Sequence, residues 1–106
     1  TEVNRGRLTL LRLSEIFSTA PAKLFGIYPR KGVIQVGSDA DLVVVDMNQR
    51  DIIRHESMLT KCGWTSWDGR EVQGIPIHTI LRGSFVMRDR KVIGEPGFGR
   101  LITPMR

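Results

Sequence analysis

The run Leu42-Val43-Val44-Val45 constrains the fold most, because an uninterrupted apolar run suits a β-strand that is covered on both faces. The chain has 106 residues, enough for one small domain. Apolar residues make up 41% of it and charged residues 25%, ordinary values for a globular protein. We therefore expect an ordered chain built around a covered strand.

Helical patterning precedes this strand, over residues 8–26. One apolar face recurs at the i, i+3, i+4 spacing of a helix: Leu10, Leu11, Leu13, Ile16 and Phe17. Thr9 can cap this helix, and Ser18-Thr19 can cap a short second helix with Pro21 in its first turn. Gly26 is suited to end the second helix. The sequence thus predicts two short helices in succession.

Strand patterning fills much of the remaining chain. Ile34 and Val36 alternate with a polar residue and predict a short strand, and we expect Asp46 to end the central strand. A strand that begins at Pro76 and two short strands around Asp89-Arg90 predict an antiparallel meander. The residues alone therefore indicate an α+β fold with helices first and a small, mainly antiparallel sheet after them.

Few residues of this chain can carry chemistry. Two histidines and one cysteine are too few for a self-contained zinc site with four nitrogen or sulfur ligands. Asp39 and Asp41 have the spacing of oxygen ligands for a hard cation, but the later acidic ligands of a calcium loop are missing, which favours turn and strand-end hydrogen bonding. A catalytic pair of Cys62 and His55 is a weak alternative. We interpret His78 as a packed or surface strand residue.

The segment 62–74 holds Trp64 and Trp67 among several glycines and predicts an irregular loop. Indole rings bury a large apolar area, so such a loop usually packs over something. The loop either clamps a ligand or anchors the chain on a neighbouring domain or subunit. We favour the anchor.

The net charge of +5 is concentrated at the two ends, with six basic and two acidic residues in 1–31 and again in 82–106. Because aromatics are only 7% and no basic run exceeds two residues, a small basic nucleic-acid binder is a minor alternative, and we expect no nucleic-acid partner. No apolar run reaches the ~18–20 residues of a membrane span. The single cysteine, Cys62, fits a reducing compartment, which favours the cytoplasm.

The stretch RKGVIQVGSDADL at 30–42 is the most specific of several motifs spread along the chain. The others are NRGRLTL at 4–10, TAPAKLFG at 19–26, KCGWTSWDG at 61–69, TILRG at 79–83 and GEPGFGR at 94–100. Together they resemble the C-terminal region of cyclic-amide hydrolases of the amidohydrolase superfamily. Dihydroorotases, allantoinases and hydantoinases form this group, and we place a dihydroorotase-like member first.

The resemblance implies a zinc enzyme whose site lies outside this chain. In the family, a (β/α)₈ barrel holds one or two zinc ions through a His-x-His pair, a carbamylated lysine, two further histidines and an aspartate. A metal-bound hydroxide then attacks the ring amide carbonyl. Because none of these motifs occurs here, no catalytic, cofactor-binding or metal-binding residue is assigned to this chain.

The resemblance also implies an architecture and a partner. Residues 1–28 resemble the last helices of the barrel, 29–93 the C-terminal part of a small β-sandwich, and 94–106 an irregular tail. In the family, strands from the N-terminus complete that sandwich, so we expect a fragment cut from a chain several times longer and inactive alone. Its unpaired strands are expected to bind the remainder of that chain or another copy, giving a homo-oligomer. A non-catalytic assembly module of the same family is the alternative.

Overall fold

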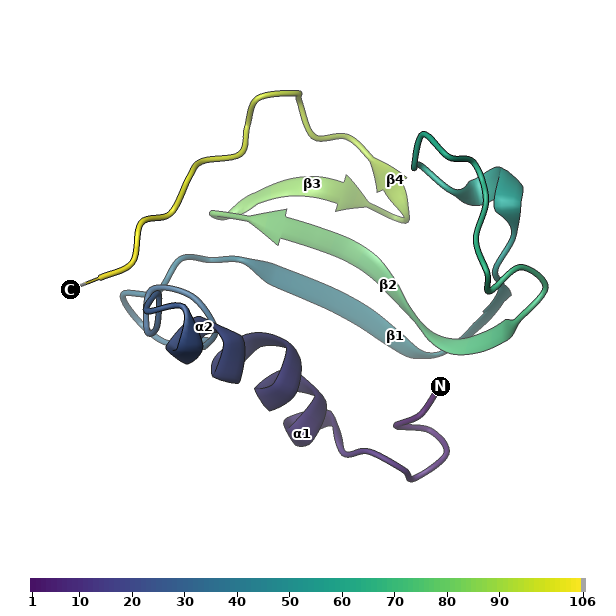
Figure 1. The fold of residues 1–106 in the computed structure, drawn as a ribbon, viewed down its shortest axis with the longest axis horizontal. Helices are drawn as coiled ribbons and strands as arrows, with labels where there is room; N and C mark the ends of the chain where they lie inside the picture. Colours follow the sequence, from purple (N-terminus) through teal and green to yellow (C-terminus); the bar gives the residue numbers. More distant parts are fainter. Residues whose placement is uncertain (106) are drawn as a thin grey trace.

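The computed structural model describes residues 1–105 and contains one helical segment and one antiparallel sheet (Figure 1). The helical segment consists of α1 (Leu10–Ser14), a π-helical stretch (Glu15–Thr19) and α2 (Ala20–Leu24). The strands, in their order across the sheet, are β1 (Leu42–Ile52), β2 (Glu71–Leu81), β3 (Ser84–Arg88) and β4 (Lys91–Val92). A single-turn 3-10 helix, His55–Ser57, lies between β1 and β2. The α+β character predicted from the residues is therefore observed.

The ends of the helical segment form as predicted. The Thr9 side chain accepts a hydrogen bond from the backbone N–H of Arg12 at 3.1 Å, the arrangement of an N-cap. At the other end, Gly26 adopts a φ of +68°, the left-handed conformation that terminates helices. Local capping chemistry thus fixes where the helical segment starts and stops.

The predicted break inside the segment is wrong, because the chain stays helical through Thr19. The Thr19 hydroxyl does not cap a helix; it donates a hydrogen bond to the carbonyl of Gly32 at 2.7 Å. Pro21 has no N–H to donate to the preceding turn. A π-helical stretch just before it widens the turn, so the helix continues past the proline.

Residues 29–41 form a compact loop, and the short strand predicted at Ile34–Val36 does not exist. The Lys31 ammonium lies 2.9 Å from a carboxylate oxygen of Asp39 and forms a second ion pair with Asp41. These ion pairs join the two ends of the loop and leave its apolar middle exposed without a strand to pair with. The alternation of apolar and polar residues therefore predicted a strand that does not form, because this segment has no neighbouring strand among residues 1–105 to pair with.

The ion pairs with Lys31 also define the structural role of the Asp39 and Asp41 carboxylates. Partial burial alone would lower the pKa of Lys31, but the hydrogen bonds that Lys31 donates to Asp39 and Asp41 outweigh it and raise that pKa above its ordinary value. The hydrogen bond from Lys31 is also the main reason that the pKa of Asp39 is lowered. The Lys31 ammonium thus contacts both carboxylates that could have held a cation, and the structural interpretation of Asp39 and Asp41 is confirmed.

Strand β1 continues past Asp46, where we expected it to end. One Asp46 carboxylate oxygen accepts the N–H groups of Asn48 at 3.0 Å and Gln49 at 3.2 Å, which pulls the backbone into a bulge. Pairing with β2 then resumes and reaches Ile52. The polar residue bends the strand instead of ending it.

The predicted meander is confirmed, with one corrected boundary. Strand β2 begins at Glu71, and Pro76 lies inside it at a register shift opposite Val45. A proline is tolerated there because a bulge does not require its missing N–H. The turns at Arg82-Gly83 and Asp89-Arg90 have positive φ at both residues, the geometry of tight hairpin turns.

The central strand is not covered, contrary to the first expectation. Val43 is 57% exposed, and among the described residues only Ala22 and Ile75 are buried apolar side chains. The chain exposes 8422 Å², whereas a compact monomer of 12.0 kDa exposes about 6,000 Å². Its radius of gyration is 15.5 Å, against about 13 Å for a compact domain of this length. The sheet and the helical segment therefore enclose very little core.

Gly32 tests how tightly the helical segment and the following loop pack. A β-carbon at Gly32 would lie 2.5 Å from the Ala22 β-carbon and 2.8 Å from the Ser18 carbonyl oxygen, whereas one at Gly37 would meet nothing within 4 Å. Both glycines have positive φ, so Gly32→Ala and Gly37→Ala share the backbone strain. Gly32→Ala should destabilise the chain by about 1–3 kcal/mol more than Gly37→Ala. Urea unfolding followed by tryptophan fluorescence measures this difference, and equal losses would refute the close packing.

Candidate docking surface

An open apolar groove lies between the helical segment and the edge strand β1. Its volume is about 520 Å³. Apolar side chains from three parts of the chain line it: Leu13 and Phe17, Val45 and Met47, and Ile53 and Trp67. Because β1 pairs only with β2 among residues 1–105, one edge of β1 borders this groove without a neighbouring strand. The groove therefore combines apolar side chains with free backbone groups.

The first residues of the chain form one wall of the groove. The Asn4 side-chain amide donates to the Met47 carbonyl at 2.8 Å, at the bulge of β1. The Thr1 hydroxyl accepts the N–H of Gln73 on β2 at 2.8 Å. These contacts attach the N-terminal segment to the bulged part of the sheet and place Thr1 and Val3 at the groove.

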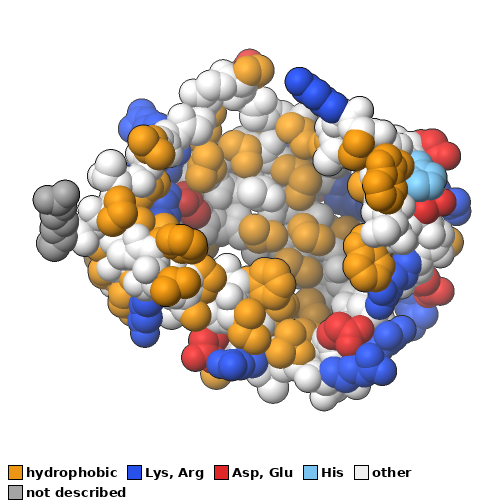
Figure 2. Space-filling model, viewed as in Figure 1, with side chains coloured by type: hydrophobic (Ala, Val, Ile, Leu, Met, Phe, Trp, Pro, Cys, Tyr) orange, Lys and Arg blue, Asp and Glu red, His pale blue; other side chains and the backbone are white. Residues whose placement is uncertain are grey.

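Apolar exposure extends well beyond the groove. Figure 2 shows a hollow over the sheet in which apolar side chains gather, ringed by the rest of the molecule. On the helical segment, Leu11 is 82% exposed and Leu24 is 81% exposed. Apolar exposure on this scale is unusual for a monomeric protein, so this face is a candidate docking surface.

Residues 54–70, which we call the tryptophan loop, are irregular apart from the 3-10 turn at His55–Ser57. The loop predicted over 62–74 therefore ends too late, because residues 71–74 belong to β2. The Arg70 guanidinium lies 4.8 Å from the centre of the Trp67 ring, and both residues line the groove. Trp64 remains 61% exposed. The loop therefore contributes Trp67 to the groove, and the anchor interpretation remains the prediction for both indoles.

Cys62 and His55 do not form a hydrogen-bonded pair. The thiol contacts the Thr60 hydroxyl at 3.2 Å and the Trp64 carbonyl at 3.7 Å. His55 instead accepts the N–H of Thr65 at Nδ1, at 3.1 Å. The Thr60 hydroxyl is the main reason that the pKa of the exposed Cys62 thiol is lowered.

His78 occupies a packed position in the sheet, as predicted. Its Nδ1 accepts the N–H of Asp89 at 3.1 Å, which fixes the turn between β3 and β4. Its ring meets the Phe85 ring edge-to-face, with 5.6 Å between the ring centres. Both contacts are structural and tie β2 to β3.

Among residues 1–105, no cluster of three or more His, Cys, Asp or Glu side chains is arranged to hold a metal ion. No helix in this range has the length and apolar character needed to cross a membrane.

Sequence reasoning missed Met47 as a groove residue. The bulge that turns it toward the groove depends on backbone hydrogen bonds to Asp46, which a period-two pattern does not reveal. One sequence signal could have indicated the bulge, namely Asp46 followed by Met47 and Asn48. An aspartate side chain readily accepts the backbone N–H two residues later and so favours a local turn.

Comparison with known proteins gives a family and a group of relatives. Residues 2–86 match the family described as the amidohydrolase family. The chain is 44% identical to the L-hydantoinase of Paenarthrobacter aurescens, covering 95% of this chain and 22% of that protein. It is 41% identical to the D-hydantoinase of Geobacillus stearothermophilus, covering 94% of this chain and 21% of that protein.

Solved structures agree. The L-hydantoinase (dihydropyrimidinase) from Arthrobacter aurescens superposes with a TM-score of 0.92 at 44% identity, over 95% of this chain and 22% of that one. The dihydropyrimidinase from Brevibacillus agri NCHU1002 gives 0.91 at 37% identity, over 99% and 23%. This chain thus spans 21–23% of the length of these relatives. All four carry hydantoinase or dihydropyrimidinase names, not the dihydroorotase name placed first from the sequence.

The hydrogen bond between the Thr60 hydroxyl and the Cys62 thiol, together with the lowered pKa of this thiol, predicts enhanced thiol reactivity. Because a lowered pKa increases the thiolate fraction at neutral pH, Cys62 should react with iodoacetamide severalfold faster in the wild-type chain than in Thr60→Val. Ser66→Ala is the control, because it lies in the same loop and the Ser66 side chain makes no hydrogen bond among residues 1–105. Cys62 in this variant should react at the wild-type rate. Equal rates in Thr60→Val and wild type would contradict this role of Thr60.

Proposed function

Because this chain belongs to the amidohydrolase family, we propose that it is the C-terminal part of a metal-dependent hydrolase that opens a cyclic amide ring. The observation that carries the proposal is the match along 95% of the chain to an L-hydantoinase at 44% identity, which covers only 22% of that protein. The chemistry of such a protein is therefore assigned to the complete polypeptide, and this chain alone is inactive.

The names of the relatives favour a substrate class. They are L-hydantoinases, D-hydantoinases and dihydropyrimidinases, so a hydantoin or dihydropyrimidine ring is the substrate that we propose for the complete protein. Dihydroorotate-like rings are the second choice, on the resemblance of the sequence motifs. A cytoplasmic location remains our proposal from the single cysteine.

The residues of this chain do not fit the zinc site that the family implies. Both histidines already accept a backbone N–H at Nδ1, and their Nε2 atoms lie 3.3 Å from an Asp68 oxygen and 3.8 Å from an Asp89 oxygen. Each imidazole is thus engaged by its own turn or loop, in different parts of the fold. We therefore assign no metal ligand to this chain and place the zinc ligands in the rest of the protein.

The architecture supports a fragment that needs a partner. We propose that the helical segment closes a barrel and that the sheet is half of a β-sandwich completed by strands outside this chain. The exposed area, about 2,400 Å² above that of a compact monomer, is in the range of large permanent interfaces. The groove along the free edge of β1 is where an added strand would gain both hydrogen bonds and apolar contacts.

A non-catalytic assembly module is the second candidate, and the same exposed apolar surface favours it. The two candidates differ in what is encoded upstream. A reading frame that continues upstream with His-x-His and Asp-His motifs identifies the hydrolase. A reading frame without them identifies the assembly module.

The enzymatic proposal predicts a clear division of activity. The complete gene product should hydrolyse hydantoin or dihydrouracil and lose this activity on treatment with a chelator, whereas the 106-residue chain should show no hydrolysis with added zinc. Ring opening followed by loss of ultraviolet absorbance measures both. Hydrolysis by the 106-residue chain itself would contradict the assignment of the catalytic residues.

The incomplete sandwich predicts self-association of the isolated chain. With its apolar groove uncovered, the 106-residue chain should form dimers or larger species at micromolar concentration, as measured by size-exclusion chromatography with light scattering. The Val45→Lys change places a charge at the groove and should shift the population toward monomer. A stable wild-type monomer that unfolds cooperatively would contradict the half-sandwich.

A further inference from the structure

We propose that the tryptophan loop is a preorganised docking loop that buries Trp64 and Leu59 against the part of the same polypeptide that lies outside this chain. The proposal rests on the proposed function, since it requires a longer hydrolase. It assigns a role to a segment that neither the zinc site nor the sandwich strands use.

The loop is closed at its base. The Ile53 N–H donates to the Arg70 carbonyl at 2.9 Å, and the Gly69 N–H donates to the Ile53 carbonyl at 2.7 Å. These two bonds join the ends of β1 and β2, so the intervening residues leave and re-enter the sheet at one point. This is the arrangement of a compact surface loop that is packed by its own side chains.

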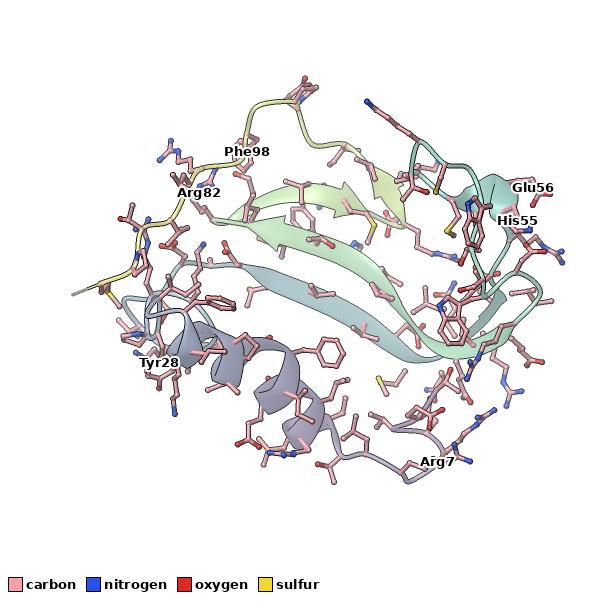
Figure 3. The ribbon with its side chains drawn as sticks, viewed as in Figure 1. Arg7, Tyr28, His55, Glu56, Arg82 and Phe98 are labelled. Atoms are coloured by element: carbon pink, nitrogen blue, oxygen red, sulfur yellow. The ribbon has the colours of Figure 1, made fainter. Side chains whose placement is uncertain are left out.

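A second set of bonds, the His55–Asp68 clasp, fixes the interior of the loop. One Asp68 carboxylate oxygen accepts the His55 backbone N–H at 2.7 Å, and the other lies 3.3 Å from His55 Nε2. His55 Nδ1 accepts the N–H of Thr65, so the ring proton of the neutral imidazole sits on Nε2 and faces Asp68. His55 thus connects both halves of the loop, and Figure 3 shows it at the outer end of the molecule beside Glu56.

This rigid loop presents large apolar side chains to solvent. Leu59 is 85% exposed and Trp64 is 61% exposed. Trp67 differs, because it lines the groove and has the Arg70 guanidinium over its ring. Tryptophan is the most frequent anchor of protein interfaces, and a loop that is ordered beforehand loses little conformational entropy on docking. Trp64 is therefore the expected anchor.

The remainder of the polypeptide fits this surface better than a second copy does. The uncovered area lies on several parts of the chain: the groove beside β1, the helical segment and the tryptophan loop. A two-fold dimer uses one patch on each copy, whereas a covalently continuous chain can contact several surfaces. The relatives are four to five times longer than this chain, which leaves ample polypeptide for such contacts.

The experiment compares the solvent access of Trp64 in two proteins. Both the complete gene product and the 106-residue chain carry Trp67→Phe, and any tryptophan outside this chain is also replaced by phenylalanine, so that Trp64 alone reports. The acrylamide quenching constant should be at least threefold lower in the complete protein than in the chain. Equal quenching in a complete protein that hydrolyses its ring substrate overturns the docking proposal and leaves the proposed function intact. A quenching constant that rises when the complete protein is diluted also overturns it, because the occupant is then a second copy.

The clasp provides the matched variants, in the complete protein. Asp68→Ala removes both acceptors for His55 and should raise the quenching constant of Trp64 at least twofold, while Asp68→Asn keeps an acceptor for the His55 N–H and should recover most of the protection. Glu56→Ala is the control, because Glu56 takes part in no side-chain hydrogen bond or ion pair among residues 1–105. Unchanged quenching in Asp68→Ala would overturn the positioning role of the clasp.

Discussion

The free edge of strand β1 governs the rest of this structure. The strand pairs with β2 on one side only, and its valines are exposed on both faces, although a run of apolar residues of this kind belongs in a covered strand. The helical segment approaches this edge but leaves an apolar groove instead of a core. The large exposed area, the small number of buried side chains and the extended shape accompany this uncovered edge.

Local chemistry made part of the fold predictable. The Thr9 cap, the Gly26 stop and the turn at Asp89-Arg90 depend on residues close in sequence, and each formed as expected. The errors share a different cause. Whether Ile34–Val36 becomes a strand depends on a neighbouring strand, and whether the central valines are covered depends on what packs against them, which we propose is polypeptide outside this chain. The apolar pattern of a segment indicates that it needs a neighbouring strand or a covering surface. The pattern does not indicate whether this chain contains that neighbour.

The candidate site was predictable to the same degree. The tryptophan loop was recognised because indoles among glycines are rare in ordinary connections. The His55–Asp68 clasp was not, because its two members are separated by an irregular stretch whose path the sequence does not define. The ion pairs of Lys31 likewise turn two aspartates with metal-like spacing into a structural cluster. In both cases, polar side chains that could have been assigned a catalytic or metal-binding role instead hold a loop in its conformation.

The central claim is that this chain is an incomplete fold that the rest of its own polypeptide completes. Isothermal titration of the 106-residue chain with the separately expressed upstream portion tests it most directly. The account predicts saturable 1:1 binding with a large negative heat-capacity change, because apolar surface is buried, and ring-opening activity that neither part shows alone. Absence of binding, together with cooperative unfolding of this chain as a monomer, would contradict it.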